Sequence, residues 1–195
     1  MSSMRGVALI VLLVTSTAAS TQAPYAAPVQ AAAVAAPSYG YSVGYALNDW
    51  RRLRQSSGYV FADYARFLNA NPGWPEESKL RGWAEKAMRP GENAGVVLSF
   101  YSSEQPKTGN GYARLADALS ATGRNVEALA AARAAWASSD LSGYDEQNIL
   151  ARYGRSFTVQ DHDRRTDALL FAKDPTDAQR FLAMTSPARR GAFTE

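Results

Sequence analysis

The chain of 195 residues contains no cysteine. No disulfide bond can therefore stabilise it in an oxidising compartment, and its stability must come from packing. The lipid anchor of bacterial lipoproteins is attached to a cysteine directly after the apolar part of the export signal. Anchoring by that route is excluded as well, because the sequence offers no such residue.

An excess of charge of one sign is also missing. The 21 basic and 18 acidic residues leave a net charge of +3 at pH 7, which is too small and too evenly spread for a nucleic-acid-binding surface. The chain is 46% hydrophobic and 20% charged, so it has enough apolar material for a core. The length of the chain predicts one domain with a tail. From the small and evenly spread charge we expect no nucleic-acid partner.

Residues that carry chemistry are scarce. His162 is the only histidine, and we expect it to be a packed, hydrogen-bonded residue because it shares a predicted helix face with Thr166 and Leu169. A metal site would need further ligands at suitable spacing, a serine nucleophile would need its elbow motif, and phosphate binding would need a glycine-rich loop. The sequence shows none of these patterns. We therefore assign no catalytic, cofactor-binding or metal-ligating residue, and expect no cofactor.

The beginning of the sequence predicts an export signal. Arg5 precedes an uncharged apolar run, Gly6–Val14, and small residues follow. This order is typical of a secretory signal peptide, which we place at residues 1–21; cleavage after Ala19 and cleavage after Ala23 both fit the small-residue rule. The run is short for a bilayer span, so we favour cleavage over a retained anchor and expect no spanning helix afterwards. Export of a cysteine-free helical chain predicts a periplasmic location.

Residues 22–43 predict a linker. Alanine, proline and valine dominate the stretch QAPYAAPVQAAAVAAPSY, which carries no charge. Its prolines break any helix, and no apolar pattern in it could pack. We interpret the segment as an Ala/Pro-rich flexible linker between the signal and the fold.

From about Ala46 onward the apolar residues recur with a period near 3.6, and no segment alternates as a strand would. Four sets follow the i, i+3, i+4, i+7 spacing of one helix face. They are Phe61, Tyr64, Ala65 and Leu68; Leu80, Trp83, Ala84 and Ala87; Ala94, Val97, Leu98 and Tyr101; and Ala178, Phe181, Leu182 and Thr185. The sequence therefore predicts an all-α domain over residues 44–195.

Prolines and capping residues divide these helices. Pro72 and Pro75 predict a turn that brings the first face against the second, with Trp74 filling the turn. Trp50, Trp74, Trp83 and Trp136 are all interpreted as core residues rather than as sugar-stacking residues. The predicted helix starts are Pro75 as first helical residue with Glu76 and Glu77 after it, a capping box at Thr158–Asp161, Asp174 before Pro175, and Ser186 before Pro187.

Residues 112–139 match the spacing of a tetratricopeptide unit. In YARLADALSATGRNVEALAAARAAWASS, the small residues Ala116 and Ala128 would let two helices approach closely, and Gly123 would supply the turn between them. A short amphipathic helix cannot bury its own apolar stripe, but stacked pairs can cover one another. The expected fold is a superhelical array of short antiparallel helix pairs, a tetratricopeptide-like α-solenoid.

Two groups of charged residues have ordinary explanations. The acidic pair Asp145–Glu146 lies at a predicted helix start, where capping accounts for it. The dense run of charges over residues 161–167 is interpreted as a solvated helix face with local ion pairs. A buried Asp–Arg pair between helix pairs is the alternative for that run.

Three stretches, in this order behind the predicted signal peptide, carry a family resemblance. They are FADYARFLNANPGWPEESKLRGWAEKAM, GNGYARLADALSATGRNVEALAAARAAW and DHDRRTDALLFAKDPTDAQRFLAMTSPARR. Together they resemble the N-terminal helical domain of soluble lytic murein transglycosylases, over roughly residues 45–195. The resemblance implies a periplasmic superhelix, curved into a U or ring, that positions a separate lysozyme-like domain. That domain cleaves peptidoglycan with a single glutamate, unlike the two-carboxylate scheme of most glycosidases.

The sequence departs from that family at the catalytic part. The catalytic pattern that surrounds the Glu-Ser pair of the family is absent, and Glu104 lies in SSEQPKT without that pattern, so no catalytic role is transferred to it. The chain ends at SPARRGAFTE without the capping unit that closes a solenoid, and we expect a fragment or a truncated product.

Two functions remain open at this stage. The first is a non-catalytic periplasmic scaffold domain of a peptidoglycan lytic transglycosylase, whose catalytic domain is not in this chain and whose partner is the glycan strand, bound through the full-length protein. The alternative is a stand-alone periplasmic tetratricopeptide-like adaptor that binds a protein.

Overall fold

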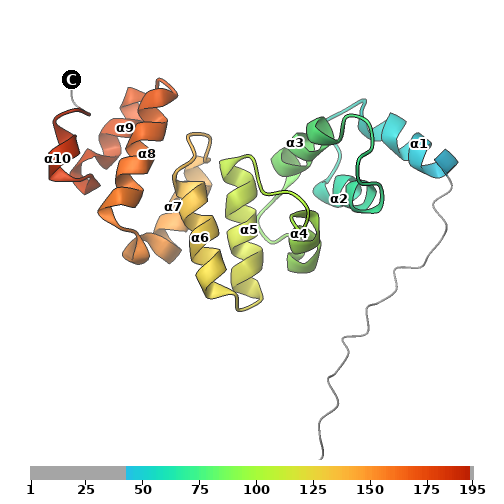
Figure 1. Cartoon of the computed structure of the whole chain (residues 1–195), viewed down its shortest axis with the longest axis horizontal. Helices are drawn as coiled ribbons and strands as arrows, with labels where there is room; N and C mark the ends of the chain where they lie inside the picture. The colour runs from blue at the N-terminus through green and yellow to red at the C-terminus, as the bar shows by residue number, and fades with distance from the viewer. Residues whose placement is uncertain (1–42, 194–195) are drawn as a thin grey trace, which may run out of the picture. The chain divides into compact units, whose positions relative to one another are not determined.

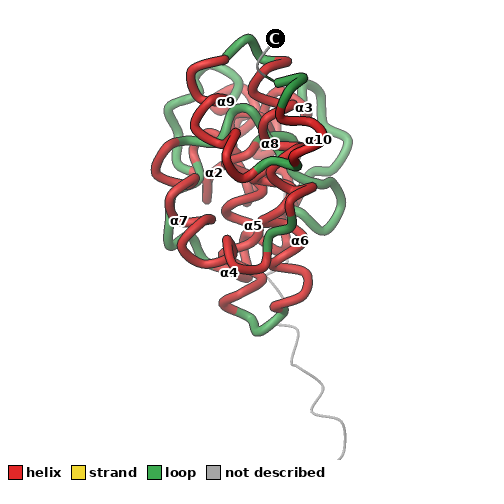
Figure 2. Tube along the Cα trace, turned by 90° about the vertical axis from the view of Figure 1, so that its left-hand side faces the viewer, coloured by secondary structure: helices red, strands yellow, loops and turns green. Residues whose placement is uncertain are grey.

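The computed structural model describes residues 43–193, all within one compact unit, and this part of the chain is helical without any strand (Figures 1 and 2). The all-α prediction is confirmed. The predicted signal peptide and all of the predicted linker except Val43 lie outside the described residues. The helices are α1 (Val43–Leu53), α2 (Phe61–Ala70), α3 (Glu77–Ala87), α4 (Ala94–Phe100), α5 (Gly109–Ala121), α6 (Asn125–Trp136), α7 (Gly143–Tyr153), η1 (Gly154–Ser156), α8 (Val159–Phe171), α9 (Pro175–Phe181), η2 (Leu182–Met184) and α10 (Pro187–Arg190).

The first core cluster joins α2, α3 and α4. Helix α2 packs against both of the others, as the predicted faces require. The residues of these faces that become buried are Phe61, Tyr64, Ala65, Leu68, Leu80, Ala84, Val97 and Tyr101. The predicted partners Trp83, Ala87, Ala94 and Leu98 are partly buried against the same cluster. Burial of these faces is the main favourable term holding the three helices together.

The turn between α2 and α3 is confirmed, but α3 begins two residues later than Pro75. Gly73 adopts a left-handed conformation with φ +77°, and Glu76 does so with φ +62°. The Glu77 carboxylate accepts a hydrogen bond of 2.6 Å from the Gly73 backbone N–H, which closes the turn before the helix starts. Trp74 packs edge-on against Phe67 with ring centroids 5.9 Å apart, so it fills the turn as predicted.

Helices α5 and α6 form the closest pair in the fold and lie side by side in both views (Figures 1 and 2). Ala116 and Ala128 are fully buried between them, and Gly123 makes the connecting turn with φ +76°. Small side chains are what permits such a close approach of two helices. The helix pair predicted over residues 112–139, with its turn at Gly123, is therefore confirmed.

The second core cluster surrounds Trp136. This side chain is fully buried and contacts Phe157 and Phe181, with ring centroids 5.6 and 5.1 Å away. Trp50, Trp74 and Trp83 are partly buried against the first cluster, so the core interpretation of the tryptophans holds. Helix α8 packs on α9, and the predicted face of α9 buries Ala178 and Phe181.

The predicted caps are present with one exception. Thr158 and Asp161 form the reciprocal capping box of α8, and the Asp174 side chain caps α9 ahead of Pro175. Pro187 is the first residue of α10, but the Ser186 side chain makes no capping bond. Instead, the Ser186 backbone N–H donates to the Asp163 carboxylate at 2.8 Å, which ties α10 to α8.

Candidate functional site

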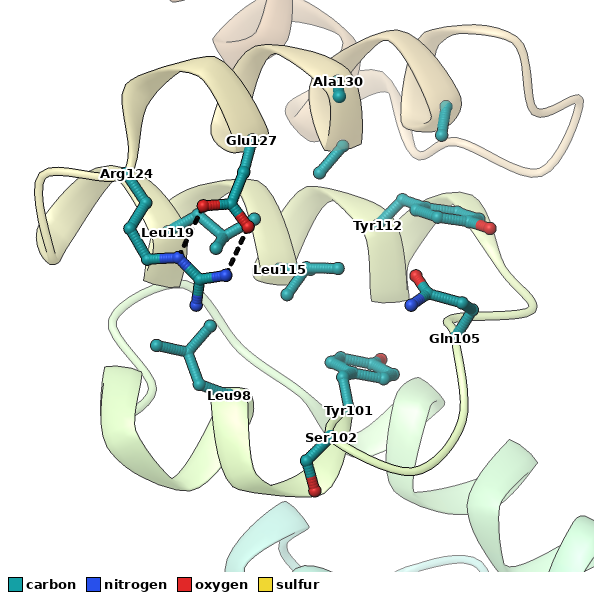
Figure 3. A pocket seen from close by; sticks show the side chains of 12 residues that line it. Leu98, Tyr101, Ser102, Gln105, Tyr112, Leu115, Leu119, Arg124, Glu127 and Ala130 are labelled. Carbon is teal, nitrogen blue, oxygen red and sulfur yellow. Dashed lines mark hydrogen bonds and ion pairs between the residues drawn. The ribbon is translucent and has the colours of Figure 1, made fainter.

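A groove of about 530 Å³ lies between α4, α5 and α6 (Figure 3). Helix α5 packs against both α4 and α6, and the groove runs over α5 between its two neighbours. Its lining residues are Leu98, Tyr101, Ser102, Gln105, Tyr112, Leu115, Leu119, Arg124, Glu127, Ala130, Ala131 and Ala134. Its volume is in the range of small-molecule and peptide side-chain sites, roughly 300–1,000 Å³.

The middle of the groove is apolar. Leu115 from α5 lies there (Figure 3), and both Leu115 and the lining residue Leu98 of α4 pack against the two core clusters. The small side chains of Ala130, Ala131 and Ala134 on α6 leave the space open on the other side. A bound group would therefore meet aliphatic surface along the centre of the groove.

Two tyrosines form one end of the groove. Figure 3 shows Tyr101 and Tyr112 with the Gln105 amide between their rings. The Tyr101 hydroxyl donates a hydrogen bond to the Met88 sulfur at 3.4 Å. Burial, together with the nearby Glu85 carboxylate, raises the pKa of Tyr101 well above its ordinary value, so the phenol stays neutral. This end offers ring faces and one amide, without a free charge.

An exposed ion pair forms the other end. The Arg124 guanidinium donates twice to the Glu127 carboxylate, with Nε 2.8 Å from Oε1 (Figure 3). This hydrogen bonding lowers the pKa of Glu127, so its carboxylate is ionised at neutral pH. A glycosidase-type general acid needs the opposite shift, a pKa raised toward neutrality, and Glu127 does not suit that role.

A buried glutamate that the sequence analysis missed holds the loop beside this groove. Glu85 is 2% exposed and accepts hydrogen bonds from the backbone N–H groups of Lys107 and Thr108, both at 3.0 Å, and from the Thr108 hydroxyl at 2.7 Å. A Cβ on Gly111 would lie 2.6 Å from the Tyr101 hydroxyl and 2.8 Å from Glu85 Oε2. Glu85 therefore fixes the loop between α4 and α5, which carries Gln105. No local pattern in the sequence marks Glu85 for this role.

The acidic pair Asp145–Glu146 is not explained by capping alone, and that interpretation was incomplete. Both side chains are buried near the start of α7, at 4% and 2% exposure. Asp145 pairs with buried Arg114 of α5, and Glu146 lies 2.7 Å from Arg165 of α8. We call Asp145 and Glu146 the α7 carboxylates. They connect α7 to helices on both sides of it in the sequence.

The interpretation of residues 161–167 as a solvated face was wrong for Asp161, Asp163 and Arg165, whereas Arg164 is exposed and forms a local ion pair. Asp161, Asp163 and Arg165 are 4%, 5% and 1% exposed. Arg165 also donates to the Ser138 carbonyl, and its guanidinium lies over the Trp136 ring, 5.3 Å from the centroid. The reason is that α8 is covered by neighbouring helices on the side that carries these charges. A buried pair between helices does form, but the partner of Arg165 is Glu146 of α7 and not an aspartate.

His162 is packed as predicted, but one of its nitrogens is not hydrogen-bonded. Its ring contacts Trp136 and Phe157, with centroids 5.8 and 6.2 Å away. Nδ1 is buried without a hydrogen-bond partner among the described residues. Burial lowers the pKa of His162, and the charges of Asp161 and Asp163 only partly offset this. The imidazole is therefore neutral at pH 7.

Glu104 takes part in surface ion pairs. Its carboxylate lies 2.9 Å from Arg81 Nε and 2.5 Å from Lys107 Nζ. Among residues 43–193 no three His, Asp or Glu side chains are grouped as a metal site would require. In the same range no helix has both the length and the apolar character needed to cross a membrane.

Comparison of the chain with protein-family models, with curated proteins and with solved structures finds no match.

Proposed function

We propose that this chain is a non-catalytic helical scaffold of the periplasm, the superhelical domain of a peptidoglycan lytic transglycosylase. In this proposal its short helix pairs stack as a tetratricopeptide-like solenoid and position a lysozyme-like catalytic domain that lies elsewhere in the protein. Residues 1–21 would direct export. The glycan strand would be the partner of the full-length protein.

The observation that carries the proposal is the way α7 is fixed between its neighbours. Its two carboxylates are buried and paired with arginines of α5 and α8, while the apolar residues around Trp136 close the same helices together. Buried charges left unpaired would be costly, so these pairs favour one relative placement of the helices. A fixed placement of successive helices is what a positioning domain requires.

The carboxylates of the groove support the absence of catalysis. Glu127 is held ionised by Arg124, and the nearby Glu85 has both oxygens occupied by the Lys107 and Thr108 donors. Neither is placed to give a proton to a glycosidic oxygen.

Incubation of the full chain with purified peptidoglycan tests the proposal. We expect at most weak co-sedimentation with the sacculi, and no release of 1,6-anhydro-muropeptides. Release by this chain, abolished by Glu127→Gln or Glu85→Gln, would overturn the scaffold assignment. A catalytically competent transglycosylase serves as the positive control.

The groove favours a second candidate, a periplasmic adaptor that binds a protein. Its aliphatic middle and tyrosine end suit an apolar side chain of a partner segment. Cross-linking from a photoreactive group at Gln105 would capture such a partner. Tyr112→Ala should abolish the capture, whereas Val126→Ala, an exposed position outside the groove, should not. Capture unaffected by Tyr112→Ala would exclude the groove as the binding site.

A further inference from the structure

A second hollow, of about 480 Å³, lies where the end of α3 meets the starts of α5 and α7. We call it the α3–α5–α7 pocket. It is lined by Lys86, Met88, Arg89, Pro90, Thr108, Asn110, Asp140, Ser142, Tyr144 and Asp145. It shares no residue with the groove between α4, α5 and α6.

Two cations in this pocket have no ion-pair partner within residues 43–193. Lys86 lies in the last turn of α3, and Arg89 follows the helix directly after Met88. Both side chains are exposed. Most other arginines and lysines of the described part are paired with carboxylates, as Arg81 is with Glu77 and Glu104. Lys86 and Arg89 therefore keep their full donor capacity.

The carboxylates of the pocket are already engaged by internal donors. Asp145 is neutralised by buried Arg114. Asp140 accepts a hydrogen bond of 2.8 Å from the Gly109 backbone N–H and another from the Ser138 hydroxyl. Among the lining residues, one carboxylate without a cationic partner thus stands against two cations without an ion pair; outside the lining, the Glu92 carboxylate accepts a hydrogen bond of 3.2 Å from the Arg89 backbone N–H.

The pocket also has a neutral hydrogen-bond donor, the hydroxyl of Tyr144. Tyr144, the second residue of α7, is 62% exposed and lines the same pocket. Its hydroxyl makes no hydrogen bond with the described residues. A guanidinium, an ammonium and a phenol around one hollow match the acceptor oxygens of a phosphate or a carboxylate, and arginine can bind either one with two hydrogen bonds.

We propose that the α3–α5–α7 pocket binds an oxyanion, the phosphate or carboxylate group of a small ligand, through Lys86, Arg89 and Tyr144. This site is independent of the scaffold function and of the groove. The ligand is held by charge-assisted hydrogen bonds from two exposed cations, so its affinity falls as salt rises.

The test uses the full chain, labelled with ¹⁵N, at low ionic strength. Inorganic phosphate and N-acetylalanine are titrated separately; N-acetylalanine amide, which lacks the carboxylate, and sodium chloride at equal ionic strength are the controls. We expect saturable shifts of the backbone amides of Lys86, Arg89, Asn110 and Tyr144. The arm that saturates at lower concentration shows which oxyanion the pocket prefers.

The variant Lys86→Gln with Arg89→Gln should weaken the binding about tenfold or more, because it removes two charge-assisted donors. The matched control is Arg51→Gln with Arg155→Gln, which removes the same charge from two exposed arginines outside the pocket and should bind as the parent does. Equal shifts with sodium chloride, or equal loss in both double variants, would overturn the proposal. So would the absence of saturable shifts with either oxyanion.

Discussion

The Glu146 carboxylate lies 2.7 Å from Nη2 of Arg165, and both side chains are almost fully buried. The same carboxylate is reached from the surface by Arg180 of α9, at 2.5 Å. One glutamate thus connects three helices, α7, α8 and α9. Such a residue is a sensitive test of how the C-terminal half of the described fold is held together.

Glu146→Gln should destabilise the protein by about 3–5 kcal/mol, because it leaves the Arg165 guanidinium charged, buried and without its counter-ion. Urea unfolding followed by circular dichroism measures the change. Glu127→Gln is the matched control: its ion pair with Arg124 is exposed, and the midpoint should not move measurably. Equal midpoints for both variants would show that the buried pair does not hold the helices.

Ala128→Leu tests the close contact of α5 and α6. Ala128 is fully buried, and three additional carbon atoms would force the two helices apart, at a cost of roughly 1–3 kcal/mol. Ala121→Leu, at the exposed end of α5, adds the same atoms outside the contact and should leave the melting temperature nearly unchanged. An unchanged melting temperature for Ala128→Leu would contradict the close packing of the pair.

Alanine substitutions at two helical glycines should change stability in opposite directions. Gly111→Ala should lower stability by roughly 1–3 kcal/mol, since its Cβ would lie 2.6 Å from the Tyr101 hydroxyl. Gly82→Ala, inside α3, meets nothing within 4 Å and should raise stability by up to about 1 kcal/mol through helix propensity. Thermal melts of both variants check the pair. Stabilisation by Gly111→Ala would show that the Glu85–Tyr101 arrangement is wrong.

The titration of His162 should make the protein less stable at pH 5 than at pH 7. Burial lowers its pKa in the folded state below the unfolded value of about 6.5, so at lower pH the unfolded chain binds a proton that the folded chain does not. The contribution of His162 to the free energy of unfolding is therefore complete above the unfolded-state pKa, and it is lost as the pH falls toward the folded-state pKa.

His162→Phe isolates this effect, because phenylalanine can occupy the space between Trp136 and Phe157 without titrating. Urea midpoints at pH 7 and pH 5 should differ less for the variant than for the parent. Asp161 adds a separate loss only in more acidic solution: burial opposes its charge, but bonds from Thr158 and the nearby Arg133 and Arg164 outweigh this and lower its pKa. An identical pH dependence in parent and variant would show that His162 is not the group responsible.

The helices and their buried faces could be predicted because they are local properties of the sequence. Phe61, Tyr64 and Leu68 recur at helix spacing, and Gly123 marks a turn that needs a positive φ. The start of α3 was misplaced because Pro75 suits a first helical position locally. The hydrogen bond between Gly73 and Glu77 delays the helix, and sequence spacing does not show such a bond.

The charged residues could not be assigned from the sequence. Asp145, Glu146 and Arg165 have the composition of a solvated surface, and only the packing of α5, α7 and α8 shows that they are buried. Their partners are 19 to 31 residues away along the chain, beyond the range of any local pattern. The groove was missed for the same reason, because its walls come from three helices.

Native-state hydrogen exchange of the full chain tests most directly whether neighbouring helices protect one another. If α5 to α9 support each other as described, their buried amides should exchange with a single free energy close to that of global unfolding, and Glu146→Gln should lower all of them together. Fast, independent exchange of α7 or α8 while α5 and α6 stay protected would contradict the account.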